Sequence, residues 1–175
     1  MKEARSCFGI RRSLVVGLLT ILVAATGCRS TSDYNPFVDI GSYDTVVIED
    51  FEGPGNAGYA FAERIARTFA RETHFRQILR ESPDASALRI RGKITRYTRG
   101  NPAMRLRYGH NIGNARFAAD VRIEDYKTGG FVASFSIYET YDTTKDRERI
   151  RQKLDTLMER AAVSLTEKLR ELGKE

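Results

Sequence analysis

The sequence predicts an α+β protein, a two-layer sandwich in which two helices cover one face of a mainly antiparallel sheet. Two observations support this prediction. Residues 88–94, 116–124 and 131–138 alternate apolar and polar side chains, which is typical of strands with one buried face. Residues 57–72 and 146–172 instead place their apolar side chains along one stripe of a helix. The expected order is β-α-β-β-β-β-α.

A secretory signal is predicted ahead of this domain, over residues 1–27. Lys2, Arg5, Arg11 and Arg12 make a positive start, and an apolar run follows over residues 14–25. The run is too short to serve as a permanent helix across about 30 Å of hydrocarbon. It ends in small residues directly before a cysteine, as a cleaved signal does.

Residues 25–28, Ala-Thr-Gly-Cys, resemble the bacterial lipobox. The resemblance implies cleavage between Gly27 and Cys28 and a diacylglycerol on the Cys28 thiol, which anchors the chain almost permanently. The alternatives are a plain signal peptide and an uncleaved anchor. We expect residues 28–42 to form a lipidated tether. Arg29 after the cysteine favours the outer membrane by analogy with enterobacterial lipoproteins.

The charge of the chain depends strongly on this signal. Residues 1–27 contain four basic residues and one acidic residue, so they carry half of the formal net charge of +6. The remaining excess is too small to indicate a nucleic-acid partner. Cys28 would be the only cysteine left after cleavage, so we expect no disulfide.

The single periplasmic domain is expected over residues 43–175. Residues 45–51 form a β-branched first strand, and residues 53–58 form a glycine-rich loop with Asn56 as the N-cap of the first helix. Another short strand is predicted at residues 75–80, ahead of the three alternating strands. Residues 125–130 predict a hairpin turn, and Gly173 ends the last helix.

Three features of the sequence could indicate chemistry, but none of them predicts a catalytic or cofactor site. Gly53, Gly55 and Gly58 spell G-x-G-x-x-G, but the chain continues as a meander rather than as βαβ units, so we interpret them as loop residues without a cofactor. His74 and His110 have no partner at metal-ligand spacing, so no metal site is expected. No nucleophile motif or carboxylate dyad is apparent. We therefore predict no catalytic residues and a protein that is not an enzyme.

Two regions are candidates for binding a partner. The outer sheet face carries Arg89, Arg91 and Lys93 on one strand, which either pair with Asp120 and Glu124 of the next strand or contact a partner. The long loop at residues 98–114 is either a passive excursion or an interface, because arginine and tyrosine are frequent at interfaces. The candidates on that loop are Arg99, Arg105, Arg107 and Tyr108.

The segment that includes the predicted strand at residues 88–94, the loop at 98–114 and the strand at 116–124 resembles a lipoprotein family of Gram-negative bacteria. This family is the domain of unknown function 4410. The resemblance rests on Gly92–Tyr97, on Gly100, Arg105, Gly109, Gly113 and Ala115 in the loop, and on Val121–Asp125 with Thr128 and Gly129. It covers about residues 43–170. The family is similar in layout to the curli-secretion lipoprotein, the amino-terminal domain of TolB and the lipoprotein activators of penicillin-binding proteins. This implies a role in binding or assembly.

We therefore expect an outer-membrane lipoprotein whose domain faces the periplasm and docks on a cell-envelope protein. The membrane is its first partner, through the lipid on Cys28. The alternative is a subunit of an oligomeric secretion or transport complex, which would need membrane-spanning strands of about 9–11 residues. The sequence does not set the oligomeric state.

Overall fold

The computed structural model describes residues 32–83, 86–108, 113–141 and 150–173. The predicted signal, with Gly27 and Cys28, lies outside these residues. The sheet strands are β1 (Ser32–Tyr34), β2 (Thr45–Ile48), β3 (Gln77–Leu79), β4 (Leu88–Thr98), β5 (Ala115–Asp125) and β6 (Phe131–Tyr141). The helices are the 3-10 turn η1 (Ile40–Ser42) and α2 (Ala57–Glu72), α3 (Pro102–Tyr108) and α4 (Ile150–Leu172).

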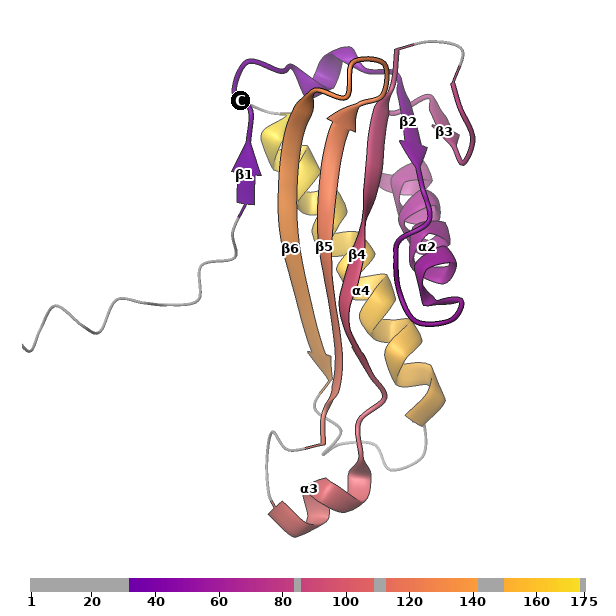
Figure 1. Cartoon of the computed structure of the whole chain (residues 1–175), viewed down its shortest axis with the longest axis vertical. Helices are drawn as coiled ribbons and strands as arrows, with labels where there is room; N and C mark the ends of the chain where they lie inside the picture. Colours follow the sequence, from indigo (N-terminus) through magenta and orange to yellow (C-terminus); the bar gives the residue numbers. More distant parts are fainter. Residues whose placement is uncertain (1–31, 84–85, 109–112, 142–149, 174–175) are drawn as a thin grey trace, which may run out of the picture.

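The predicted fold class is confirmed, because α2 and α4 lie side by side on one face of a six-stranded sheet (Figure 1). The strand order is β1-β6-β5-β4-β2-β3. β4, β5 and β6 form an antiparallel meander, whereas β2 runs parallel to both β3 and β4. Parallel neighbours need a crossover connection, and α2 supplies it between β2 and β3.

α2 begins and ends where the sequence predicts. Its apolar stripe, with Phe61, Ile65 and Phe69, is fully buried against the sheet. Asn56 occupies the N-cap position, but its side chain makes no capping hydrogen bond. The start of the predicted last helix, residues 146–149, lies outside the described residues. From Ile150 onward, α4 buries Leu154, Leu157 and further apolar residues at helical spacing.

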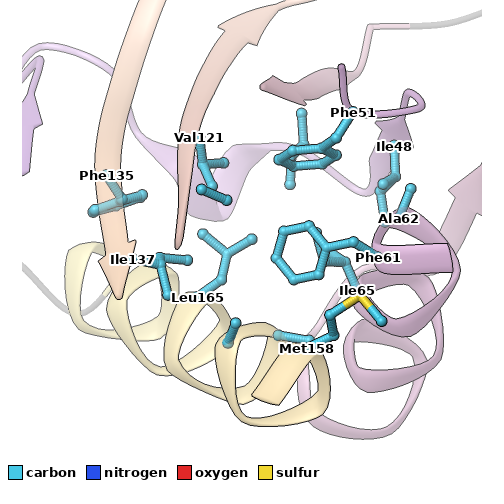
Figure 2. Packing of buried hydrophobic residues seen from close by; sticks show 14 of the residues in the cluster. Ile48, Phe51, Phe61, Ala62, Ile65, Val121, Phe135, Ile137, Met158 and Leu165 are labelled. Atoms are coloured by element: carbon cyan, nitrogen blue, oxygen red, sulfur yellow. The ribbon is translucent and has the colours of Figure 1, made fainter. Parts of the chain in front are cut away.

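One hydrophobic core lies between the two layers (Figure 2). Phe61 of α2 stands at its centre, with its ring centroid 4.9 Å from that of Phe51 and 4.8 Å from that of Phe117. From α4, Leu165 lies beside Ile137 and Val121 of the sheet. Met158 of the same helix lies beside Phe61 and Ile65 of α2. Both helices are therefore needed to bury this face of the sheet.

Two segments differ from the sequence-based expectation. Residues 32–34, inside the expected tether of residues 28–42, form the edge strand β1 on β6, and Ile40 of the same segment is buried in the core. Residues 102–108, inside the expected loop of residues 98–114, form α3. Both elements are too short to show a recognisable period of hydrophobicity. α3 projects at the end of the sheet away from the β5–β6 hairpin turn (Figure 1).

Candidate functional site

The face of the sheet opposite the helices, called here the outer face, carries the charged side chains of β4 and β5. The antiparallel register places Arg89 opposite Glu124, Arg91 opposite Arg122 and Lys93 opposite Asp120. Side chains directly opposite one another in such a ladder are close enough to form ion pairs. Arg89 and Lys93 therefore face acidic residues of the next strand, whereas Arg91 faces Arg122 and reaches Glu124 diagonally.

Glu124 is the centre of the first cluster on this face. Its side chain is only 3% exposed, and its two carboxylate oxygens accept hydrogen bonds from Arg89 at 2.7 Å and Arg91 at 2.9 Å. Arg122 adds an ion pair at 2.6 Å. The guanidinium of Arg89 also lies over the ring of Tyr126, 5.5 Å from its centroid. A buried carboxylate thus holds three arginines together.

The electrostatics of the Glu124 cluster favour the ionised carboxylate. Burial by itself raises the pKa of Glu124, but the hydrogen bonds from Arg91, Arg89 and Arg122 and the positive charge of Arg91 together leave the pKa below its ordinary value. The same bonds, made to a carboxylate, raise the pKa of Arg91. Because Arg89 and Arg91 are committed to Glu124, their first role is to stabilise this end of the sheet.

Further along β4, charges of both signs are balanced. Lys93 lies 3.8 Å from Glu52, and both side chains are largely exposed. Asp120 accepts a hydrogen bond of 2.8 Å from Ser136. A shallow hollow here is lined by residues of both signs: Glu49, Asp50, Glu52, Arg91, Lys93, Asp120 and Arg122. Exposed pairs of this kind contribute little stability and form a mixed surface without a dominant charge.

The charge of the outer face changes from mixed to positive beyond the β-bulge of β4, which lies between Ile94 and Arg96. Beyond it lies a second hollow, the basic hollow, lined by Arg96, Thr98, Arg99, Gly100, Asn101, Met104, Gly113, Asn114 and Arg116. Among the described residues that line it, three are arginines and none carries a carboxylate. The Asn114 side-chain oxygen is buried, and no hydrogen-bond partner for it is found within the described part of the chain. The positive charge of the basic hollow therefore suits a partner that brings negative charge.

α3 stands directly beside the basic hollow. Asn101 caps the helix, because its side-chain oxygen accepts hydrogen bonds from the Ala103 amide at 3.0 Å and the Met104 amide at 3.3 Å. Tyr108 is half exposed, and the guanidinium of Arg107 lies 5.5 Å from its ring centroid. The helix contains Arg105, whose side chain lies outside the described residues. Of the four loop candidates, Arg99 lines the basic hollow and Arg107 and Tyr108 lie on α3.

Arg96 and Arg116 are missing from the sequence-based candidates, although the sequence contains a signal for them. Residues 85–119 include eight basic residues and no Asp or Glu: Arg89, Arg91, Lys93, Arg96, Arg99, Arg105, Arg107 and Arg116. Only the tertiary structure shows that Glu124, from the next strand, neutralises the first part of this run. Arg96, Arg99 and Arg116, from the later part of the run, line the basic hollow.

The glycines of residues 53–58 serve packing. A Cβ atom on Gly58 would lie 1.7 Å from the carbonyl oxygen of Phe51, and one on Gly53 would lie 3.0 Å from the Ile94 side chain. Gly55 adopts a positive φ of 57°. Each glycine therefore has a structural reason. Within the described residues, no group of three or more His, Cys, Asp or Glu side chains is arranged to hold a metal ion.

None of the helices in the described part of the chain is both long and apolar enough to cross a membrane. The mixed sheet, its single helical layer and its charged outer face define a small two-layer α+β domain with an open surface. Residues 52–145 match the model of the family described as "Domain of unknown function (DUF4410)". The chain belongs to that family.

Solved structures share the fold. A PelC variant from Paraburkholderia phytofirmans, solved as a dodecamer, is 14% identical, with a TM-score of 0.52 over 78% of this chain and 95% of that chain. The PelC dodecamer in another crystal form is 15% identical, with a TM-score of 0.50 over 75% and 95%. A DUF330-family protein from Xanthomonas campestris is 11% identical, with a TM-score of 0.54 over 74% and 84%. No curated protein matches the sequence.

Proposed function

We propose that this protein is an outer-membrane lipoprotein whose periplasmic domain docks, without catalysis, on an acidic surface of another cell-envelope protein. The observation that carries the proposal is the basic hollow, where Arg96, Arg99 and Arg116 lie together and no carboxylate is found among the described lining residues. Complementary charge speeds encounter and selects among partners. Membership of the DUF4410 family and the lipobox at residues 25–28 support the location.

The chemistry of the basic hollow favours a protein partner. Guanidinium groups form paired hydrogen bonds with carboxylates, and α3 adds the exposed side chains of Met104 and Tyr108. Arginine, tyrosine and methionine are the residue types that are enriched in protein–protein interfaces. The Glu124 cluster lies nearer the other end of the same face. It stabilises that part of the sheet and takes no part in the proposed contact.

Crosslinking in living cells tests this function. A photo-crosslinking amino acid in place of Tyr108 should capture a partner when the rest of the chain is unchanged. Adding Arg96→Glu together with Arg99→Glu should abolish the crosslinked band. Arg76→Glu is the matched control, because Arg76 is 80% exposed in its side chain and pairs with Asp44 away from α3. If the double charge reversal leaves every crosslinked band unchanged, the docking surface is wrong.

The absence of catalysis needs a test of its own. The intact protein, assayed against panels of hydrolase substrates, should show no turnover above that of a sample denatured by heat. Turnover that saturates with substrate and disappears on unfolding would replace the docking proposal with an enzymatic one.

A second candidate function is that of a subunit in an oligomeric envelope complex. The observation that favours it is the shared fold with PelC, which is solved as a dodecamer. The sheet also ends in two open edges, β1 and β3, each three residues long. Edges this short offer few backbone hydrogen bonds, so side chains would have to hold a ring together. Mass measurement of the purified lipoprotein in detergent separates a monomer from a closed ring.

A further inference from the structure

Phe37 is the most exposed large apolar side chain in the described part of the chain. The residue is 95% exposed, whereas the exposure of the others ranges from 44% to 54%: Tyr34, Tyr59, Met104, Tyr108 and Tyr138. An aromatic ring in water lacks the favourable free energy that burial of its apolar surface would provide. Phe37 belongs neither to the hydrophobic core nor to the lining of the basic hollow. Neither the core nor the basic hollow therefore accounts for its position.

The exposure of Phe37 is imposed by the backbone around it. The Asn35 side-chain oxygen accepts a hydrogen bond from the Phe37 amide at 3.1 Å, and the Asn35 amide donates to the Val132 carbonyl of β6 at 2.8 Å. Val38 packs against the core and Ile40 is buried within it. The turn is thus fastened to β6 on one side and to the core on the other. The backbone at Phe37 is therefore held in place while its side chain is exposed to solvent.

The place of Phe37 in the chain indicates what it contacts. Cys28 precedes Ser32 by four residues, and four extended residues span at most about 14 Å. Ser32 pairs with Phe135 and Tyr34 with Ala133, so β1 and the turn that follows it lie along the first part of β6. A lipid on Cys28 would hold this corner of the domain, and Phe37 with it, beside the membrane surface.

We propose that Phe37 inserts into the membrane interface as a second contact beside the lipid, which rests on the lipid anchor of the proposed function. Aromatic side chains suit the boundary between headgroups and acyl chains. The acidic side chains of Asp33 and Asp39 flank the turn, so the contact is apolar rather than driven by anionic headgroups. β5 is eleven residues long, which separates this corner from α3 by about 35 Å. α3, beside the basic hollow, then lies at the end of the sheet farther from the membrane (Figure 1).

Tryptophan fluorescence tests this orientation, because the chain contains no tryptophan. Phe37→Trp and Tyr108→Trp each introduce a single reporter, one at each end of the sheet. Both lipoproteins would be purified from membranes and reconstituted in zwitterionic phosphatidylcholine vesicles whose acyl chains carry bromine. F37W should show blue-shifted emission and strong quenching by the brominated chains, whereas Y108W should show neither.

The outcomes separate this inference from the proposed function. Failure of both variants to float with vesicles contradicts the lipid anchor, and the Phe37 contact fails with it. Flotation with unquenched F37W emission keeps the anchor and overturns the Phe37 contact. Quenching of Y108W instead of F37W would show that the basic hollow faces the bilayer, which overturns the orientation as well.

Discussion

The carbonyl oxygen of Phe51 lies 1.7 Å from the position that a Cβ atom on Gly58 would occupy. The first turn of α2 therefore rests directly on the chain that leaves β2, and only glycine fits there. The Phe51 side chain is constrained in the same way, because a Cβ atom on Gly92 would lie 2.7 Å from its ring. Two glycines and one phenylalanine thus set the distance between α2 and the sheet.

Gly58→Ala should reduce the free energy of unfolding by about 3 kcal/mol, because the added methyl group forces α2 away from the sheet. Gly55→Ala is the matched control in the same loop. Nothing lies within 4 Å of a Cβ atom there, so only its positive φ opposes the change, at about 1 kcal/mol. Urea denaturation of the three proteins measures the difference. Equal losses would contradict the packing explanation.

Glu124→Gln should destabilise the protein by about 2 kcal/mol at pH 7, since it leaves three arginines around a neutral side chain. The folded state lowers the pKa of Glu124, so its stabilising effect is complete above the unfolded value of about 4.3 and is lost as the pH falls through the lowered value. The gap between wild type and variant should therefore close below about pH 4. Chemical denaturation across this pH range measures it.

Asp120→Asn provides the control for the Glu124 variant. Asp120 lies on the same face of β5 but is exposed, so its replacement should cost less than about 1 kcal/mol. A gap between wild type and Glu124→Gln that stays constant from pH 7 to pH 3 would show that the ionised carboxylate is not what holds the cluster.

Asn101→Ala should loosen α3 and leave the rest of the domain intact, because the capping bonds to the Ala103 and Met104 amides are lost. A lost cap of about 1 kcal/mol corresponds to roughly fivefold faster hydrogen exchange at these amides. Asn101→Asp, which keeps a capping oxygen, should restore protection. If Asn101→Ala changes neither amide, the cap does not hold α3.

Cys28→Ser should prevent lipid attachment and signal cleavage, because serine has no thiol to carry the diacylglycerol. Incorporation of labelled palmitate and the size of the protein in membrane fractions are the measurements. Cys7→Ser is the control, since Cys7 belongs to the predicted signal. Recovery of the same processed, labelled form from Cys28→Ser would refute the lipobox at its first step.

The fold could be predicted from the sequence because its main helices and strands are long and periodic. β4, β5 and β6 each extend over eleven residues, and α2 and α4 each carry a continuous apolar stripe. Burial of one face dictates such patterns, so the sequence reports them directly. β1 and α3 were missed because three and seven residues provide too few repeats to establish a period.

The sequence alone thus determined the class of the fold, the order of its long elements and the candidate arginines. Tertiary structure decided what each arginine does. Arg89 and Arg91 donate hydrogen bonds to the buried Glu124 of a neighbouring strand, whereas Arg96 and Arg116 line the basic hollow. The physical reason is that a period of hydrophobicity is a local property of the chain, whereas the partner of a charge is chosen by strand register, which joins residues far apart in sequence.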